Sequence, residues 1–335
     1  MKYTVIVPVY NGEDTIAECL QSLINQEGVV LEKDYTIMVV DDGSTDNTLK
    51  IVRGFPVRIL QLPENRGRII ARLSGAGAAA TERILFVDSR ISLSADTIGR
   101  LDEFAGYPAV IGEVQAEETK YDSLIHTVLY LIRRRYYGTE NFPMRSDELL
   151  ITEANFKRSP KGTALLLIDR NLFIELTPER TGKDVSDDTL LFHNLVFKHK
   201  VNLLRSRKLF FKYSLRSDLR QFSSWLCHRG VLFSDFYLRP GGYFFLPFIL
   251  FSAIGAVAII TTAALMFQSP AGALIPLTVA CLLNAALSVH LAEKPIDIPR
   301  AFVALPVVVT IFSSGVAVFW IRMLKSLITA GRKTF

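Results

Sequence analysis

Three acidic segments hold the residue types best suited to chemistry in this chain. Residues 41–44 read Asp-Asp-Gly-Ser after an apolar run, Asp88 closes a second apolar run, and Asp187 with Asp188 precedes a helical pattern. Carboxylates in such places can accept hydrogen bonds from ribose hydroxyls or base N–H groups, hold a divalent cation, or take up a proton. The structural alternative is a turn or a helix cap, because Asp, Gly and Ser serve both.

The elements that position these carboxylates alternate between strand and helix patterns over residues 1–115. Strands are predicted at 3–7, 36–40, 57–61 and 84–87, and helices at 16–24, from Thr45 or Asp46 through Val52, and at 67–80. This alternation indicates an α/β fold with a mostly parallel sheet flanked by helices. Open sheets of this kind bind ligands beyond the carboxyl ends of their strands, where two of the acidic segments fall. No G-x-G-x-x-G follows the first strand and the sequence has no P-loop motif, which disfavours dinucleotide-binding and P-loop proteins.

The acidic turn becomes more specific when it is combined with two other segments, 6–11 (Ile-Val-Pro-Val-Tyr-Asn) and 65–67 (Asn-Arg-Gly). In this order and spacing, the three closely resemble the family 2 glycosyltransferases with a GT-A fold, a likeness that covers residues 1–230. The resemblance implies an inverting enzyme that takes its sugar from a nucleotide diphospho-sugar. By position, it assigns the donor pocket to Pro8, Tyr10, Asn11, Asp41, Asp42 and Arg68.

The next landmark of the family is a D-x-D motif, whose two carboxylates hold a divalent cation against the diphosphate. Here the motif reads Asp88-Ser89-Arg90. One carboxylate can still bind a cation that the diphosphate already chelates, so we expect Asp88 to be a metal ligand and Mg²⁺ or Mn²⁺ to be the cofactor. Two alternatives stay open: Arg90 meets the phosphates itself, because a guanidinium matches their geometry, or it points to solvent or pairs with Asp96.

The catalytic base is implied by a further resemblance. The segment 184–190 is similar to the family's acidic pair, whose second member takes the proton from the acceptor hydroxyl, and this maps the base to Asp188 with Asp187 as its partner. The alternative is an acidic first turn of a helix, stabilised by the helix dipole. Upstream, residues 161–170, which include Gly162, resemble the small-residue strand that forms the floor of the acceptor site.

The C-terminal part of the chain has a different composition. Residues 244–267, 271–292 and 301–321 contain no Asp, Glu, Lys or Arg, and each run reaches the ~20 apolar residues that a membrane-spanning helix needs. We therefore expect a GT-A domain at 1–230, an interfacial segment at 231–243 and a transmembrane region at 244–335 with two or three helices. Charged residues on both sides of the third run leave the side of the C-terminus open.

Basic residues gather before the first apolar run in a chain whose net charge is +5: Arg205, Arg207, Lys208, Lys212, Arg216, Arg220, Arg229 and Arg239. Such a cluster suits lipid headgroups or phosphates and marks the cytoplasmic side, whereas no motif supports nucleic-acid binding. Because residues 3–8 already read as a core strand, we expect no signal peptide before them and a catalytic domain in the cytoplasm, at the inner (cell) membrane. The 3 cysteines have no C-x-x-C spacing, which agrees with a reducing compartment.

Residues 221–225 (Gln-Phe-Ser-Ser-Trp) are similar to the Q-x-x-R-W signature of processive family members, except that Ser224 takes the place of the arginine. This departure disfavours the synthesis of long polymers. We assign acceptor or phosphate binding to Gly162, Arg220, Gln221, Trp225 and Arg229. An ordinary amphipathic surface helix is the alternative for the last four.

These observations predict a membrane-anchored inverting glycosyltransferase of the hexosyltransferase type. It would move a single sugar from a UDP- or GDP-sugar to a lipid-linked acceptor, either a polyprenyl phosphate or a lipid-linked saccharide, at the cytoplasmic face. The resemblance places this step in bacterial envelope polysaccharide assembly. The alternatives are a processive polysaccharide synthase and a non-catalytic membrane scaffold that keeps the GT-A fold. The oligomeric state stays open.

Overall fold

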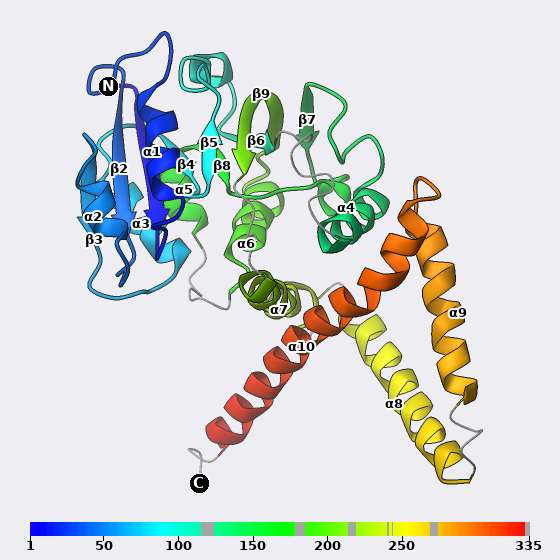
Figure 1. Ribbon diagram of the computed structural model, residues 1–335. Helices are drawn as coiled ribbons and strands as arrows, with labels where there is room; N and C mark the ends of the chain where they lie inside the picture. The colour runs from blue at the N-terminus through cyan, green and yellow to red at the C-terminus, as the bar shows by residue number, and fades with distance from the viewer. Residues whose placement is uncertain are drawn as a thin grey trace. The chain divides into compact units, whose positions relative to one another are not determined.

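The computed structural model describes residues 1–114, 124–177, 185–213, 219–239, 241, 242, 244–268 and 274–331. The chain divides into two compact units. The first consists of Met1–Glu118 and Tyr136–Arg216, and the second of Thr119–Arg135 and Ser217–Phe335. Figure 1 labels the elements of both units.

One sheet runs through the first unit and contains nine strands within the described residues. The strands are β1 (Tyr3–Val9), β2 (Tyr35–Asp41), β3 (Arg58–Gln61), β4 (Arg83–Val87), β5 (Ile91–Leu93), β6 (Ala109–Val114), β7 (Glu148–Ile151), β8 (Leu165–Asp169) and β9 (Leu203–Tyr213). Their order is β3-β2-β1-β4-β8-β6-β9-β5, and β7 pairs with β9 beside this path. The strands predicted at 3–7, 36–40, 57–61 and 84–87 are confirmed as β1 to β4, and the strand expected within 161–170 is confirmed as β8.

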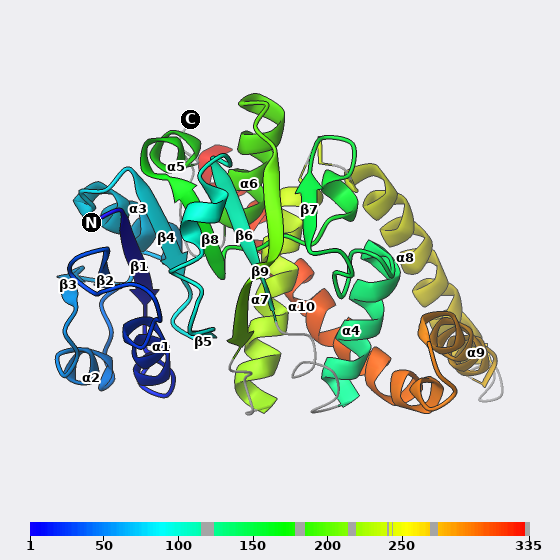
Figure 2. The ribbon, with the colours of Figure 1, turned by 90° about the horizontal axis from the view of Figure 1, so that it is seen from above.

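Helices cover both faces of this sheet, as Figure 2 shows from above. The helices of the unit are α1 (Ile16–Ile24), α2 (Thr48–Val52), α3 (Arg68–Ala78), α5 (Arg170–Leu176) and α6 (Asp187–His193), with short turns η1 (Leu101–Phe104), η2 (Phe156–Arg158) and η3 (Asn194–Lys198). One hydrophobic core lies under α1, α2 and η1, and a second lies under α3, α5 and α6. Because β1 and β2 face a core on each side, their sequences are continuous apolar runs rather than alternating ones.

The expected parallel sheet is found only in the N-terminal half. β1 pairs in parallel with both β2 and β4, and β2 pairs in parallel with β3. Beyond β4 the sheet is mixed, because β8 runs antiparallel to both β4 and β6 while β6 and β9 are parallel. The sequence after residue 115 has no regular strand–helix alternation, so this mixed half could not be read from it.

The register of the parallel strands brings the predicted donor residues to one edge. Pro8 of β1 lies opposite Val40 of β2, and Ile6 of β1 lies opposite Phe86 of β4. Asp88 follows Phe86 by two residues and is therefore level with Pro8, while Asp41 and Asp42 follow Val40 directly. The carboxyl ends of three neighbouring strands thus meet where ligands bind in open α/β sheets.

The basic cluster predicted from the sequence contains one residue that cannot face a membrane. Arg205 lies within β9, is 4% exposed, and forms an ion pair with the equally buried Glu113 of β6. Its inclusion among headgroup-binding residues was wrong, because its charge is neutralised by Glu113 inside the sheet. Arg216 lies outside the described residues.

The second unit is helical. It contains most of α4 (Leu124–Tyr137), followed by α7 (Leu219–Tyr237), α8 (Phe245–Gln268), α9 (Leu274–Leu291) and α10 (Asp297–Gly331). Within the described residues, one helical stretch is long and apolar enough to cross a membrane, Asp297–Ser326, in which an 18-residue window has a mean hydropathy of 2.3. A shorter apolar stretch covers Thr278–Leu291. The predicted domain limit at residue 230 falls inside α7, and no feature of the sequence indicated that α4 joins this unit.

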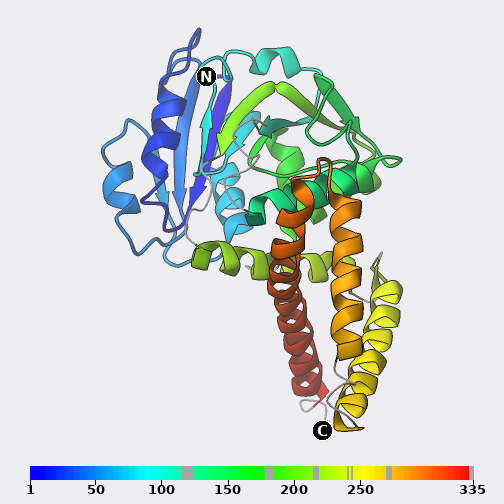
Figure 3. The same ribbon diagram turned by 45° about the vertical axis from the view of Figure 1, so that its right-hand side comes forward.

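The turn between α9 and α10 is held against α4. Arg134 of α4 pairs with Glu293, and Arg135 donates a hydrogen bond to His290 at 2.8 Å. Asp297, which is 1% exposed, closes the turn by accepting the N–H groups of Glu293 and Lys294. Figure 3 shows α9 rising to this turn and α10 descending from it, so the far end of α10 lies away from α4.

Two glycines let α7 and α10 touch through their backbones. A Cβ atom on Gly315 of α10 would lie 1.8 Å from the carbonyl oxygen of Cys227, and one on Gly230 of α7 would lie 2.2 Å from that of Phe312. Any side chain at either position would push the helices apart. This crossing therefore depends on the absence of a methyl group at two specific places.

We expect Gly315→Ala to lower the unfolding temperature of the protein in detergent, because the added methyl group overlaps the Cys227 carbonyl. Overpacking of this kind costs about 1–3 kcal/mol. The matched control is Gly77→Ala in α3, where a Cβ meets nothing within 4 Å. Thermal unfolding followed by circular dichroism compares the variants. Equal stability of Gly315→Ala and the unchanged protein would contradict the close crossing.

Candidate active site

The turn after β2 is held to a neighbouring loop by Asp42. Its carboxylate accepts the backbone N–H of Arg66 at 2.9 Å and that of Gly67 at 2.8 Å, and its own N–H donates to the Val9 carbonyl. The side chain is almost fully buried, at 3% exposure. Asp42 therefore joins the ends of β1 and β2 to the start of α3. Asp42 thus has the structural role of a turn residue, and its carboxylate oxygens still have lone pairs that could accept hydrogen bonds from a ligand.

Asp41 has a similar role one residue earlier. It is fully buried, and both carboxylate oxygens lie 3.2–3.3 Å from the Ser44 N–H. Gly43 between them has a φ of +72°, and a Cβ atom there would lie 2.7 Å from the backbone of Glu64. The turn thus requires glycine twice, for its left-handed conformation and for its close approach to the 64–67 loop.

Asn11 fastens the end of β1 to the same turn. Its backbone N–H donates to Ser44 Oγ at 2.9 Å, and its side-chain Oδ1 accepts the Thr45 N–H at 2.9 Å. Pro8 is half-buried in β1, whereas Tyr10 is 46% exposed beyond the strand. Of the three predicted residues on this segment, Tyr10 is therefore the one that presents a ring to an incoming ligand.

Asp88 and Arg90 form a forked ion pair at the end of β4. Arg90 Nε donates to Asp88 Oδ1 at 2.9 Å, its Nη2 donates to Oδ2 at 2.8 Å, and its backbone N–H donates to Oδ1 at 3.1 Å. Burial alone would raise the pKa of Asp88, but the charge and hydrogen bonds of Arg90 outweigh it and hold that pKa below its usual value. The carboxylate is therefore ionised and engaged through both oxygens.

Asp188, the predicted base, is held by three side chains from other elements. Thr163 Oγ1 donates to Asp188 Oδ1 at 2.7 Å, and Arg72 Nη1 donates to the same oxygen at 3.1 Å. Arg68, predicted to contact the donor, lies 3.8 Å from Oδ2 through its Nη2. The structure thus brings Arg68 and Asp188 together. Asp187 is the first residue of α6, and its side chain lies outside the described part of the chain.

Arg72 and Thr163 are site residues that sequence reasoning missed. Arg72 is 4% exposed, and besides Asp188 it donates from Nη2 to the Thr163 carbonyl at 3.0 Å. Its charge also contributes to the lowered pKa of Asp88, so one guanidinium acts on both carboxylates. The available signal was its spacing: Arg72 follows Arg68 by four residues, which puts both on one face of α3.

Gly162 borders this cluster on the side of β8. A Cβ atom there would meet open space, so the predicted acceptor floor is open at this residue. The preceding Lys161 turns inward and donates to the carbonyls of Phe156 and Ser159. Burial, assisted by the charge of Arg205, lowers the pKa of Lys161 to about 8. Lys161 thus ties the 156–161 segment together and is turned away from solvent.

The remaining predicted acceptor residues belong to the second unit. Arg220, Gln221 and Arg229 are exposed on α7. The guanidinium of Arg229 lies over the Trp225 ring, 5.3 Å from its centroid. This pairing of a cation with an aromatic ring suits an interfacial helix. Their part in acceptor binding stays a prediction.

The contacts of Asp88 do not fit a bound divalent cation. Both of its oxygens already accept hydrogen bonds from Arg90, and no group of three His, Cys, Asp or Glu side chains gathers as metal ligands within the described residues. A cation would have to displace the guanidinium or tolerate a like charge beside it. The predicted metal role of Asp88 is therefore not supported by this geometry.

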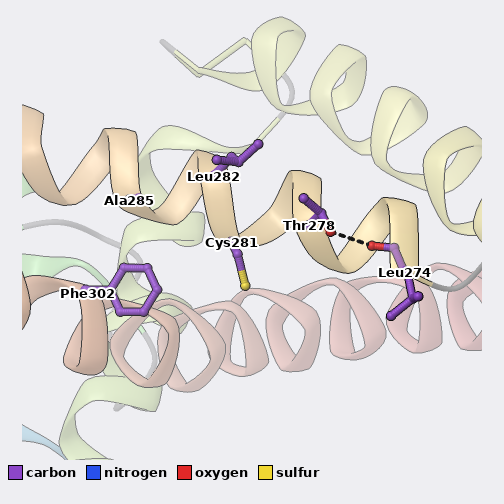
Figure 4. Close-up of a pocket in the computed structure, with 6 residues that line it drawn as sticks. All are labelled: Leu274, Thr278, Cys281, Leu282, Ala285 and Phe302. Atoms are coloured by element: carbon purple, nitrogen blue, oxygen red, sulfur yellow. Dashed lines mark hydrogen bonds between the residues drawn. The ribbon is translucent and has the colours of Figure 1, made fainter.

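A separate cavity lies in the second unit between α9 and α10. Figure 4 shows its lining of Leu274, Thr278, Cys281, Leu282, Ala285 and Phe302. Its volume is about 400 Å³. The Thr278 hydroxyl donates a hydrogen bond to the Leu274 carbonyl at 2.8 Å. With no Asp, Glu, His, Lys or Arg side chain in its lining, this groove suits hydrocarbon.

Comparison with known proteins identifies similar glycosyltransferase sequences. Residues 4–156 match the family model described as Glycosyl transferase family 2. The poly(ribitol-phosphate) beta-glucosyltransferase of Bacillus spizizenii is 38% identical over 111 residues, which are 31% of this chain and 17% of that protein. Succinoglycan biosynthesis protein ExoO of Rhizobium meliloti is 39% identical over 105 residues, 30% of this chain and 29% of ExoO. The chain thus matches less than a third of the length of either relative.

Two solved structures share the fold. Residues 1–349 of TarS from S. aureus, in complex with UDP-GlcNAc, align with a TM-score of 0.50 at 20% identity, over 70% of this chain and 67% of that one. The mannosyltransferase PcManGT from Pyrobaculum calidifontis, in complex with GDP-Man and Mn²⁺, aligns with a TM-score of 0.51 at 20% identity, over 68% and 61%.

The first unit is therefore an α/β structure of the GT-A class, with its acidic residues at the carboxyl ends of parallel strands. The chain carries a family 2 glycosyltransferase domain.

We expect Gly43→Ala to destabilise the protein by about 1–3 kcal/mol, because alanine would be strained at a φ of +72° and would overlap the Glu64 backbone. Gly162→Ala is the matched control, since its Cβ meets open space. Thermal unfolding of both variants checks this. If Gly43→Ala unfolds at the temperature of the control, the account of this turn is wrong.

Proposed function

We propose that this protein is an inverting glycosyltransferase that moves one sugar from a UDP- or GDP-sugar to a lipid-linked acceptor at the cytoplasmic face of a membrane. The observation that carries the proposal is the cluster around Arg72. Arg72 donates hydrogen bonds to Asp188 and to the Thr163 carbonyl, and its charge helps to lower the pKa of Asp88. This cluster lies at the edge of the sheet where the segments that resemble the donor motifs of family 2 meet.

The reaction we propose is a single displacement at the anomeric carbon. A hydroxyl oxygen of the acceptor forms a bond to that carbon while the bond to the β-phosphate oxygen breaks, so the nucleoside diphosphate leaves with the electron pair. The hydroxyl proton passes to the Asp188 carboxylate. Inversion follows because the nucleophile enters opposite the leaving group, which demands in-line positioning of both.

The contacts of Asp188 suit a general base. Oδ1 accepts two hydrogen bonds and Oδ2 faces Arg68, so the side chain is fixed in orientation while 21% of it stays exposed. A positioned carboxylate of this kind contributes about 10²–10⁴-fold to rate. If the acceptor is a polyprenyl phosphate, its oxygen is already ionised near neutral pH and Asp188 matters less.

A role for the donor turns follows from their rigidity. Asp41, Asp42 and Asn11 hold the ends of β1 and β2 in one geometry, beside the exposed ring of Tyr10. We propose that the nucleoside lies here, with its base against Tyr10 and its ribose or base edge on the remaining lone pairs of the acidic pair. In a preformed pocket, little binding free energy is lost to ordering side chains when the ligand binds.

The lipid-linked acceptor is supported by the second unit. Its α10 contains a stretch long and apolar enough to cross a membrane, and the groove beside α9 is lined by apolar side chains. The B. spizizenii relative is named for transfer to poly(ribitol phosphate), and ExoO for succinoglycan biosynthesis. Envelope polysaccharide or glycolipid assembly is the setting that we propose for this chain too.

Donor hydrolysis is the experiment that tests the activity, since it requires no acceptor. We expect detergent-purified protein, with Mn²⁺ present, to release UDP or GDP from one member of a panel of nucleotide sugars. Chromatography of the nucleotides measures this. If no nucleotide sugar in the panel is hydrolysed or bound, the proposal is contradicted and a non-catalytic scaffold is favoured.

We expect Asp188→Asn to lower the rate of donor hydrolysis by about 10²-fold or more while nucleotide affinity stays within about twofold, because water also needs a base. Asp169→Asn is the matched control: Asp169 ends β8 and pairs with Arg83. Initial rates and calorimetric titration separate the two effects. Full hydrolysis by Asp188→Asn would remove the general-base role.

A further inference from the structure

We propose that Arg90 binds the donor's diphosphate and takes the place that a divalent cation has in other GT-A sites. This inference rests on the proposed function, because it assumes that a nucleotide diphospho-sugar occupies the edge of the sheet. It concerns how the negative charge of the leaving group is balanced. Four observations support it.

The first is the forked geometry. Arg90 meets Asp88 through Nε and Nη2, at 2.9 and 2.8 Å, so both carboxylate oxygens face a guanidinium. Asp88 then acts as an orienting partner for Arg90. An arginine held in this way keeps its charge and presents a planar set of donors, which matches phosphate oxygens.

The second observation is an unsatisfied donor. Arg90 Nη1 is buried and has no hydrogen-bond partner among the described residues, although the side chain as a whole is 27% exposed. A buried N–H group without a partner is costly and uncommon in a native protein. A phosphate oxygen would supply the missing acceptor with a small movement of the guanidinium.

The third observation is that the side chain is already positioned. The Arg90 guanidinium lies over the Tyr213 ring of β9, 5.1 Å from its centroid. It is therefore held by Asp88 on one side and by an aromatic ring on the other. Little rotamer freedom is left to lose when a ligand binds. The neighbouring Ser89 Oγ would lie 3.7 Å from a Cβ on Gly12, which places this turn against the β1–α1 turn.

The fourth observation is the charge balance. Burial lowers the pKa of Arg90, the charge of Asp88 raises it above its usual value, and Arg68 is close enough to oppose that rise. Arg68 and Arg72 lie beside Asp188, and Arg90 lies beside Asp88, so both of these carboxylates are already paired with guanidiniums. The positive charge of Arg90 attracts a diphosphate and opposes the entry of a divalent cation.

Calorimetric titration with UDP and GDP, and with UMP and GMP, tests the inference on full-length protein in detergent. Each titration is done in excess EDTA and again with Mn²⁺. We expect one diphosphate to bind with an affinity that EDTA changes by less than about threefold, and the matching monophosphate to bind more weakly.

Two variants examine the residue itself. Arg90→Gln should weaken diphosphate binding about 30-fold or more and monophosphate binding only a few-fold, which a misfolded protein could not do. Arg90→Asp should bind the diphosphate only when Mn²⁺ is present, because it restores a second carboxylate to the motif. Arg100→Gln, a change at an exposed arginine paired with Asp96, is the matched control and should leave all affinities unchanged.

The outcomes separate the two proposals. Diphosphate binding that disappears in EDTA and returns with Mn²⁺ in the unchanged protein would overturn the role of Arg90 and leave the proposed function intact. So would an Arg90→Gln variant that keeps its full preference for the diphosphate over the monophosphate. Failure of every nucleotide to bind under both conditions would overturn the proposed function and this inference together.

Discussion

The interaction on which the site depends is the set of bonds made by the buried guanidinium of Arg72. It comes from α3, donates to Asp188 of α6 and to the carbonyl of Thr163 before β8, and its charge reaches Asp88 after β4. A buried charge is tolerated only when it is paired and hydrogen-bonded, so these elements must close around it together. The contacts of Arg72 therefore connect the packing of the second hydrophobic core to the position of Asp188.

The motif at the end of β4 has an arginine, Arg90, where the family pattern has a second carboxylate, so a positive charge is still present at this position. A D-x-D pair needs a cation to meet a diphosphate. The forked pair of Asp88 and Arg90 contains its own cation and fixes its direction. Arg72 and Arg68 add positive charge from the neighbouring helix, and Asp188 balances part of it. In the proposed reaction, the negative leaving group would therefore meet positive charge that is carried by side chains.

The sequence predicted what local patterns encode. Continuous apolar runs identified β1 to β4, and the turn residues that follow β2 and β4 located the edge of the sheet at which we expect a ligand. It did not reveal Arg72, because the partner of that arginine lies 116 residues away and no local pattern links the two. For the same reason, Arg205 was grouped with surface cations, although Glu113 neutralises it inside the sheet. Of the strands after residue 115, the sequence indicated β8 within residues 161–170 but not its antiparallel pairing, and it missed β7 and β9, because irregular segments separate them. The domain limits and the acceptor residues on α7 stay predictions.

The most direct test of the account is an experimentally determined structure of the full chain with a bound nucleotide diphospho-sugar. The account predicts the nucleoside beside Tyr10 and the 41–44 turn, the diphosphate on Arg90, and the anomeric carbon facing the Asp188 carboxylate. A nucleotide bound elsewhere on the protein, or a diphosphate turned away from Arg90 with Asp188 far from the sugar, would contradict it.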